Sequence, residues 1–247
     1  MIYSDITNKS DKNFLNKINS QVGKSINNYK LIEENDSILV ALSGGKDSMV
    51  MLDILSWRLK HLPIKYKITA VHVELNGLPY KVDKKRLTEF CELRNIKLIY
   101  KTEDVDITKS KKTPCFICSH TRRKILFTLA YELKCNKLAF GHHKDDAVET
   151  LLMNMMFYSN ISSIPAKVSM FNGKFELIRP LINIRNADTL RYSEILDYSK
   201  MEKNCSYENL TKRNSISELL KNIEQINSQG VNNIFKSMTN ISNDYLP

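Results

Sequence analysis

Long apolar stretches are missing from this sequence, and no run approaches the roughly 18 residues that a membrane-spanning helix needs. The segment from Met1 to Lys17 is polar and lacks the apolar core of a signal peptide. Cysteine is scarce and odd in number, five residues in 247, which argues against a disulfide framework. There is also no internal repeat and no low-complexity segment. We therefore expect a cytoplasmic protein with no membrane partner.

Acidic residues are outnumbered by basic ones, 27 Asp and Glu against 37 Lys and Arg, which gives a formal net charge of +10. An excess of this sign suits a polyanionic partner, although solvated helix faces would account for part of it. The length allows one α/β domain with helical additions, or at most two small domains.

Two common phosphate-binding motifs are absent. A Walker A loop needs a glycine where Val40 stands and Ser or Thr where Asp47 stands, and a dinucleotide fingerprint needs three spaced glycines. The chain has instead Ser43-Gly44-Gly45-Lys46-Asp47-Ser48, between an apolar run rich in branched residues and an apolar segment of helical character. A strand, a glycine turn and a helix N-terminus together offer backbone N–H groups to an anion.

Strand and helix patterns alternate along the chain, which predicts a parallel, twisted sheet with helices on both faces. Strands are expected near 37–42, 66–73, 96–100, 137–141 and 175–178, and helices near 11–32, 49–60, 79–94, 114–134, 145–157, 187–199, 213–226 and 231–241. Ligands of such sheets lie beyond the carboxyl ends of the strands, where we expect the Ser43 loop, Glu74 and His142. We divide the chain into an N-terminal helical segment (1–35), a nucleotide-binding domain (36–185) and a C-terminal helical extension (186–247).

A second cluster of polar residues, Gly141 to Thr150, follows the fourth expected strand. On a helix, His142, Asp145 or Asp146, and Glu149 fall within three or four residues of each other and share a face. Such groups beside a nucleotide could hold Mg²⁺ or orient the nucleotide, whereas the plainer alternative is a capped helix with charged residues facing solvent.

Cys115 and Cys118 form a CxxC pair at the start of a helix. The pair alone leaves zinc, an iron–sulfur cluster and redox chemistry open, although a long basic loop before it does not suit a thioredoxin-like site. A structural zinc would have to recruit Cys205 and a histidine such as His120, because four ligands are needed. The two other cysteines, at positions 91 and 135, have apolar neighbours and are expected in the core.

Five features occur along the chain in this order: the SGGKDS loop, the CxxC pair, the GHHKDD element, Arg179-Pro180-Leu181 and a late cysteine. Together they resemble the tRNA 2-thiocytidine synthetases (TtcA family) of the PP-loop ATP pyrophosphatases, over about residues 24 to 245. The resemblance implies an adenine-nucleotide alpha-hydrolase-like fold of class α/β.

The same resemblance implies an activity and a set of cofactors. Family members use ATP and Mg²⁺ to adenylate cytidine 32 of tRNA and replace its 2-oxygen with sulfur, with the help of a [4Fe–4S] cluster on three cysteines. The implied partners are tRNA and a sulfur donor such as a cysteine desulfurase, and the implied state is a homodimer. Rival hypotheses are a PP-loop enzyme that thiolates another nucleotide, a lysidine-type ligase, and a zinc-containing nucleic-acid-binding module.

The residues to which these motifs and the resemblance assign roles fall into four groups. They are Asp47, Cys115, Cys118 and Cys205 for catalysis; Ser43, Gly44, Gly45, Lys46, Asp47, Ser48, His142 and Asp146 for the nucleotide; Cys115, Cys118 and Cys205 for the cluster, with Asp47 for Mg²⁺; and Arg122, Arg123, Lys111 and Lys112 for tRNA.

Overall fold

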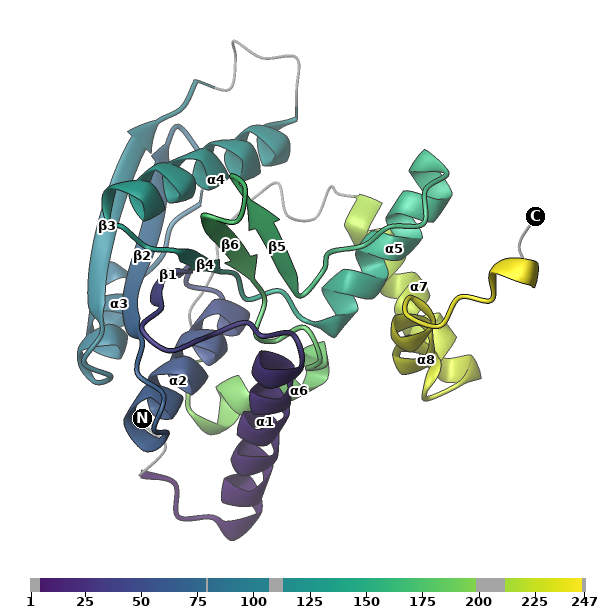
Figure 1. Ribbon diagram of the computed structural model, residues 1–247, viewed down its shortest axis with the longest axis horizontal. Helices are drawn as coiled ribbons and strands as arrows, with labels where there is room; N and C mark the ends of the chain where they lie inside the picture. Colours follow the sequence, from purple (N-terminus) through teal and green to yellow (C-terminus); the bar gives the residue numbers. More distant parts are fainter. Residues whose placement is uncertain (1–4, 79, 107–112, 199–211, 246–247) are drawn as a thin grey trace.

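The computed structural model describes residues 5–78, 80–106, 113–198 and 212–245, and these contain a six-stranded sheet in the order β3-β2-β1-β4-β6-β5 (Figure 1). The strands are β1 (Ser37–Ala41), β2 (Lys67–Asn76), β3 (Lys97–Asp104), β4 (Lys137–Ala139), β5 (Lys167–Met170) and β6 (Phe175–Ile178). The helices are α1 (Lys9–Asn28), α2 (Lys46–His61), α3 (Lys84–Glu92), α4 (Pro114–Glu132), α5 (Lys144–Tyr158), α6 (Asn186–Ile195), α7 (Lys212–Ile226) and α8 (Gly230–Ser237), with a 3-10 turn, η4 (Asn243–Tyr245).

The sheet changes direction of winding at β1. This strand pairs in parallel with β2 on one side and with β4 on the other, so that Val40 lies between Ala70 and Ala139. In an open α/β sheet the carboxyl ends on either side of such a point leave a crevice for a ligand. The loops that follow β1 and β4, which carry the SGGKDS and GHHKDD elements, both begin at this point.

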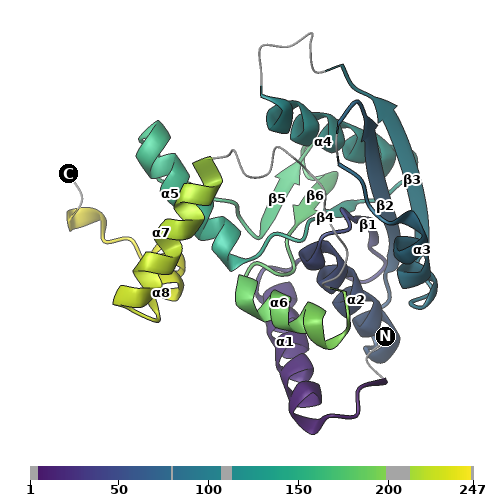
Figure 2. The same ribbon diagram turned by 180° about the vertical axis from the view of Figure 1, so that it is seen from behind.

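Both faces of β1 are buried, as expected of a central parallel strand. Ile38 and Val40 face a core shared with α1, α2, α3 and α6, whereas Leu39 faces a second core shared with α4. The two views of the ribbon agree with this division: α4 lies along one face of the sheet, and α1, α2 and α6 lie along the other (Figures 1 and 2). The predicted α/β class, with helices on both faces, is confirmed.

One strand was not predicted. β5 pairs antiparallel with β6, so the expectation of a wholly parallel sheet needs correction at this edge. The turn between them, from Phe171 to Gly173, has three consecutive residues with positive φ, of 52°, 58° and 84°. A four-residue strand at a partly exposed edge has too short a pattern to be distinguished from a loop.

Several element boundaries also differ from the sequence-based ones. β3 continues to Asp104, beyond the predicted end at Tyr100. The helix expected from Pro79 begins at Lys84, because the Asp83 side chain accepts a hydrogen bond from the Arg86 N–H at 3.0 Å and caps its first turn.

The chain after the sheet divides into two parts. α6 packs on α1 and α2 in the first core, whereas α7 and α8 pack on α5 around Val148, Leu220 and Val231, to one side of the sheet (Figure 2). The three-part division of the chain stays a prediction, and α1 and α6 share their core with the sheet. No helix within the described ranges is long and apolar enough to cross a bilayer.

A buried ion pair at the first core connects three helices. The Arg94 guanidinium, just after α3, donates from Nε to Asp53 Oδ1 of α2 at 2.6 Å, and both side chains are almost completely buried. Tyr192 of α6 donates its hydroxyl to Asp53 Oδ2 at 2.7 Å, and Arg94 Nη2 bonds the Tyr198 hydroxyl. The guanidinium also lies 3.7 Å from the centre of the Phe90 ring. α2, α3 and α6 are therefore fixed relative to one another by one charge pair.

Replacing Arg94 by Met is expected to lower the free energy of unfolding by about 3–5 kcal/mol, because the Asp53 carboxylate would stay buried without its cation. Urea denaturation followed by circular dichroism measures the change. The control is Arg191→Met, which removes an exposed arginine 3.7 Å from Asp11 and is expected to cost about 1 kcal/mol or less. Equal losses in the two variants would contradict a special role for the buried pair.

Candidate active site

The SGGKDS loop folds on its own side chains. The Ser48 hydroxyl donates to the Gly45 carbonyl at 2.8 Å and lies 3.1 Å from the Ser43 hydroxyl, which accepts from the Gly45 N–H at 3.3 Å. Gly44 has a φ of 82°, a conformation that favours glycine. Gly45 is the N-cap of α2 and has no side chain to occupy the first N–H groups of the helix. These donors and the positive end of the helix dipole suit an anion such as a phosphate.

The loop after β4 touches this loop directly. A Cβ added at Gly141 would stand 2.9 Å from the Asp47 carbonyl carbon and 2.9 Å from the Ser48 nitrogen. Only a residue without a side chain permits that approach. The two loops predicted to meet at the crevice therefore do so by backbone contact.

Asp47 lies at the centre of a charged cluster. The Lys46 ammonium lies 2.6 Å from Asp47 Oδ1. The Thr189 hydroxyl of α6 donates to the same oxygen at 2.6 Å. Burial by itself would raise the pKa of Asp47, but Lys46, His143 and Thr189 together hold the pKa below its ordinary value of 3.8. Asp47 is therefore ionised at neutral pH and able to attract a cation.

The histidine next to Asp47 is His143, and the nucleotide-binding role that the motif indicates for its neighbour His142 stays a prediction. His143 Nε2 lies 4.0 Å from Asp47 Oδ1. Its Nδ1 accepts the Asp146 N–H at 3.3 Å, and Asp146 in turn accepts the His143 N–H at 2.9 Å, so the pair forms a capping box at the start of α5. Because Nδ1 is an acceptor, the proton of the neutral ring lies on Nε2, toward Asp47. Asp146, predicted to bind the nucleotide, has this capping role in the structure.

Asp145 joins α5 to the start of α6. Its carboxylate accepts from the Arg185 guanidinium at 2.9 and 3.2 Å and from the Asn186 N–H at 2.7 Å. Burial would raise the pKa of Asp145, but these donors lower it below 3.8. These contacts are not predictable from local sequence patterns, since α5 and α6 are separated along the chain by β5 and β6.

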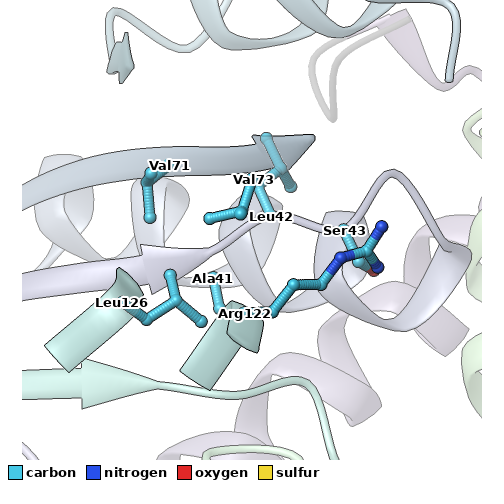
Figure 3. A pocket seen from close by; sticks show the side chains of 7 residues that line it. All are labelled: Ala41, Leu42, Ser43, Val71, Val73, Arg122 and Leu126. Carbon is cyan, nitrogen blue, oxygen red and sulfur yellow. The ribbon is translucent and has the colours of Figure 1, made fainter. Parts of the chain in front are cut away.

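On the other side of the Ser43 loop lies a small open pocket (Figure 3). Its lining consists of Ala41, Leu42, Ser43, Val71, Val73, Arg122 and Leu126. Arg122 extends from α4 toward Ser43, and its guanidinium carbon lies 4.1 Å from the centre of the Tyr80 ring, while the Tyr80 hydroxyl donates to the Ser43 carbonyl. Arg122 Nε and Nη2 are buried and have no hydrogen-bond acceptor among the described residues. The pocket therefore combines apolar walls with donors suited to a ligand.

A buried histidine is hydrogen-bonded to the backbone of the pocket-lining residue Leu42. His72 of β2 donates from Nδ1 to the Leu42 carbonyl at 2.8 Å. Burial, with a contribution from the positive charge of Arg122, lowers the pKa of His72 below 6.5, so the ring is neutral at pH 7. Glu74, which the sequence placed at the crevice, forms an ion pair with Lys84 of α3.

Cys115 and Cys118 lie in the first turns of α4, half-buried and not joined in a disulfide. They fall three residues apart and Arg122 follows four residues later, a spacing that puts all three on one face of the helix. Cys118 packs against the second core, as does Leu126 farther along α4. The pocket-lining Arg122 and the two thiols therefore share the face of α4 that is turned toward the sheet.

Other predicted residues lie elsewhere or outside the described ranges. Arg123 is exposed on α4. Burial, with a contribution from the positive charge of Arg123, lowers the pKa of Arg179, which is buried just after β6. Cys205, Lys111 and Lys112 fall outside the described residues. Within the described ranges, no three His, Cys, Asp or Glu side chains converge as a metal site.

Comparison with known proteins decides the family. The PP-loop domain family matches residues 14–223. A tRNA-cytidine(32) 2-sulfurtransferase from Cupriavidus necator is 33% identical over 238 residues, covering 93% of this chain and 74% of the relative. Another, from Francisella tularensis, is 34% identical over 249 residues, covering 96% of this chain and 92% of the relative. The chain belongs to the tRNA-cytidine(32) 2-sulfurtransferase family of PP-loop proteins.

Solved structures agree with this family assignment. The U34-tRNA thiolase NcsA from Methanococcus maripaludis, solved with its [4Fe-4S] cluster, has a TM-score of 0.74 and 26% identity, covering 93% of this chain and 79% of the thiolase. An NAD⁺ synthetase from Burkholderia pseudomallei, at 12% identity and a TM-score of 0.52, shows the fold alone. The resemblance read from the sequence motifs is confirmed, and so is nucleotide binding as the role of the PP-loop domain.

Gly141→Ala is expected to weaken ATP binding by about tenfold or more, because the new methyl group would push the SGGKDS loop away from the β4–α5 loop. Isothermal titration calorimetry measures the dissociation constant. Gly23→Ala is the control, since its Cβ would meet only the end of the flexible Arg58 side chain, at 2.6 Å. Unchanged affinity in Gly141→Ala would show that the loops do not need this close contact.

Proposed function

We propose that this protein is an ATP-dependent tRNA sulfurtransferase that adenylates cytidine 32 of tRNA and replaces its 2-oxygen with sulfur, giving 2-thiocytidine. The observation that supports it most is the face of α4, on which Cys115 and Cys118 precede the Arg122 that lines the Ser43 pocket. Thiols and a phosphate-binding loop are thus brought to the same edge of the sheet. The names of the relatives supply the target base and position.

The nucleotide site would activate the base. The N–H groups of the SGGKDS loop and the first turn of α2 would hold the phosphates, with the Ser43 and Ser48 hydroxyls alongside. Asp47 is the residue proposed to hold Mg²⁺, an ion that prefers oxygen ligands and would neutralise phosphate charge. The Nε and Nη2 groups of Arg122 would donate to an oxygen of the substrates in the pocket. Such prearranged donors stabilise charge as it develops on a reacting phosphate.

The proposed reaction has two balanced steps. The cytosine O2 attacks the α-phosphorus, the bond to the β-phosphate oxygen breaks, and pyrophosphate leaves. Hydrosulfide sulfur then forms a bond to C2, the C2–O2 bond breaks, AMP leaves with the oxygen, and the hydrosulfide proton passes to water. Sulfur stays at the sulfide oxidation level, so no oxidant or reductant is consumed.

A [4Fe–4S] cluster is the proposed carrier of that sulfur, and the cysteines fit it. Cys115 and Cys118 are half-buried and lie on one helix face, and clusters are held by cysteine thiolates. Cys205 is the proposed third ligand. Held by these thiolates, a cluster would supply sulfide-level sulfur for transfer to the base.

The proposal also assigns the protein a tRNA substrate, a sulfur donor, a cellular compartment and an oligomeric state. Arg123, Lys111 and Lys112 would contact the phosphates of the tRNA anticodon arm, and the target base would have to leave its stack to reach the site. A cysteine desulfurase would supply sulfur as a persulfide, and a thiol reductant would release it as hydrosulfide while being oxidised to a disulfide. The protein would act in the cytoplasm as a homodimer. These assignments rest on the family resemblance.

The activity is tested with anaerobically purified protein, a tRNA transcript, ATP, Mg²⁺ and sulfide, followed by nucleoside mass spectrometry. We expect 2-thiocytidine at position 32 and one AMP and one pyrophosphate per thiolated base. Thiolated uridine in its place would move the proposal to a U34-type thiolase, such as the NcsA neighbour. Modification without ATP consumption, or none at all, would overturn it.

Cys115→Ser and Cys118→Ser are each expected to abolish thiolation and to lower bound iron, because each removes one thiolate ligand. ATP affinity should stay within about twofold of wild type, since neither side chain is part of the SGGKDS loop. Iron content, visible absorption and titration calorimetry measure these properties. Cys91→Ser is the control: burial raises the pKa of that thiol to about 12, so it is an inert core residue. Tightly bound zinc in colourless wild-type protein would overturn the cluster proposal.

A further inference from the structure

We propose that Asn186 and Thr189 are positioning residues for ATP activation, which fasten Lys46 to α6 and so fix the orientation of the Asp47 carboxylate. Both residues lie in the first turns of α6, more than a hundred residues along the chain from the SGGKDS loop. The inference rests on the proposed role of Asp47 in holding Mg²⁺ beside the nucleotide.

The Lys46 ammonium is fully engaged within the protein. It donates to Asp47 Oδ1 at 2.6 Å, and it also donates to Asn186 Oδ1 at 2.6 Å and to Thr189 Oγ1 at 3.1 Å. A lysine ammonium has three N–H donors, and each has one of these acceptors. Lys46 therefore connects the phosphate-binding loop to α6, and the phosphates are left to the backbone N–H groups and serine hydroxyls.

Thr189 links the cation and the anion of this cluster. Its side chain is fully buried, and its hydroxyl donates to Asp47 Oδ1 at 2.6 Å while accepting from Lys46. The Asn186 carbonyl lies 3.0 Å away as a second acceptor for the one hydroxyl proton, but the bond to a carboxylate is the stronger. Among the described residues, the side-chain contacts of Asp47 fall on Oδ1, so Oδ2 is the oxygen available to a cation.

α6 is itself a fixed support for these contacts. At its start, the Asn186 N–H donates to Asp145 Oδ2 of α5 at 2.7 Å. Toward its end, Tyr192 donates to the buried Asp53 of α2 at 2.7 Å. Anchored at both ends, α6 holds Asn186 and Thr189 in place while Lys46 and Asp47 reach them. A flexible support would leave the carboxylate free to rotate away from a cation.

The test compares the binding of α,β-methylene-ATP with and without Mg²⁺, measured by titration calorimetry, in wild type, Thr189→Val and Thr189→Ser. Loss of a hydrogen bond to a carboxylate is expected to reduce the affinity gain given by Mg²⁺ by about tenfold in Thr189→Val. Thr189→Ser, which keeps the hydroxyl, should restore the gain. A general loosening of α6 would weaken binding equally with and without Mg²⁺ and would leave the ratio of the two affinities unchanged.

Ser193→Ala is the matched control on the same helix. Its hydroxyl is also fully buried and bonds one turn back, to the Leu190 carbonyl at 2.7 Å. We expect the wild-type Mg²⁺ ratio in this variant. The double variant Lys46→Met/Thr189→Val should be no worse than the poorer single variant, because both changes break one connection.

A wild-type Mg²⁺ ratio in Thr189→Val, or additive losses in the double variant, would overturn the positioning role. Wild-type protein that failed to bind the analogue at all would instead overturn the proposed ATP chemistry. Because the wild-type titration is read first, the two failures are distinguishable.

Discussion

The buried contact between Asp53 and Arg94 is the constraint on which the arrangement of the active site depends. Charges are costly to remove from water, and such a pair is tolerated only where further hydrogen bonds complete it. Tyr192 and Tyr198 provide those bonds. Since Asp53 lies in α2 and Tyr192 in α6, the pair fixes the helix that begins at the phosphate-binding loop against the helix whose first turns reach back to that loop.

The opposite face of the sheet contributes the second half of the site. α4 packs on the core around Leu39, with Arg122 reaching the Ser43 pocket and the two cysteines on the same helix face. Helices thus reach the carboxyl ends of β1 and β4 from both faces of the sheet. α2 and α6 lie on one face, and α4 lies on the other. Such a crevice can bring a bound nucleotide close to reactive thiols even though the nucleotide-binding loop and the cysteines lie on different segments of the chain.

What the sequence could reveal follows the range of the interactions involved. The SGGKDS loop was predicted because strand, glycine turn and helix start are contiguous, and this motif also led to the family. The contacts of Thr189 and Asp145 could not be predicted, since they join segments separated by 142 and 40 residues in the chain. The sequence pattern indicates His142 for the nucleotide, which stays a prediction, and it does not reveal that His143 turns toward Asp47. Neighbouring residues at a helix N-cap diverge in direction, and only the capping box sets the direction of the His143 ring.

Arg122 indicates how binding and catalysis could be connected in this site. Two of its buried N–H donors have no acceptor among the described residues, an omission that costs roughly 1–3 kcal/mol for a buried group. A substrate oxygen in the pocket would relieve that cost. Because Tyr80 fixes the guanidinium above Ser43, the donors need no reorientation when charge develops there. Relief of that cost by bound substrate would strengthen binding, whereas the rate would gain only as far as these donors bind a reacting phosphate more strongly as its charge develops.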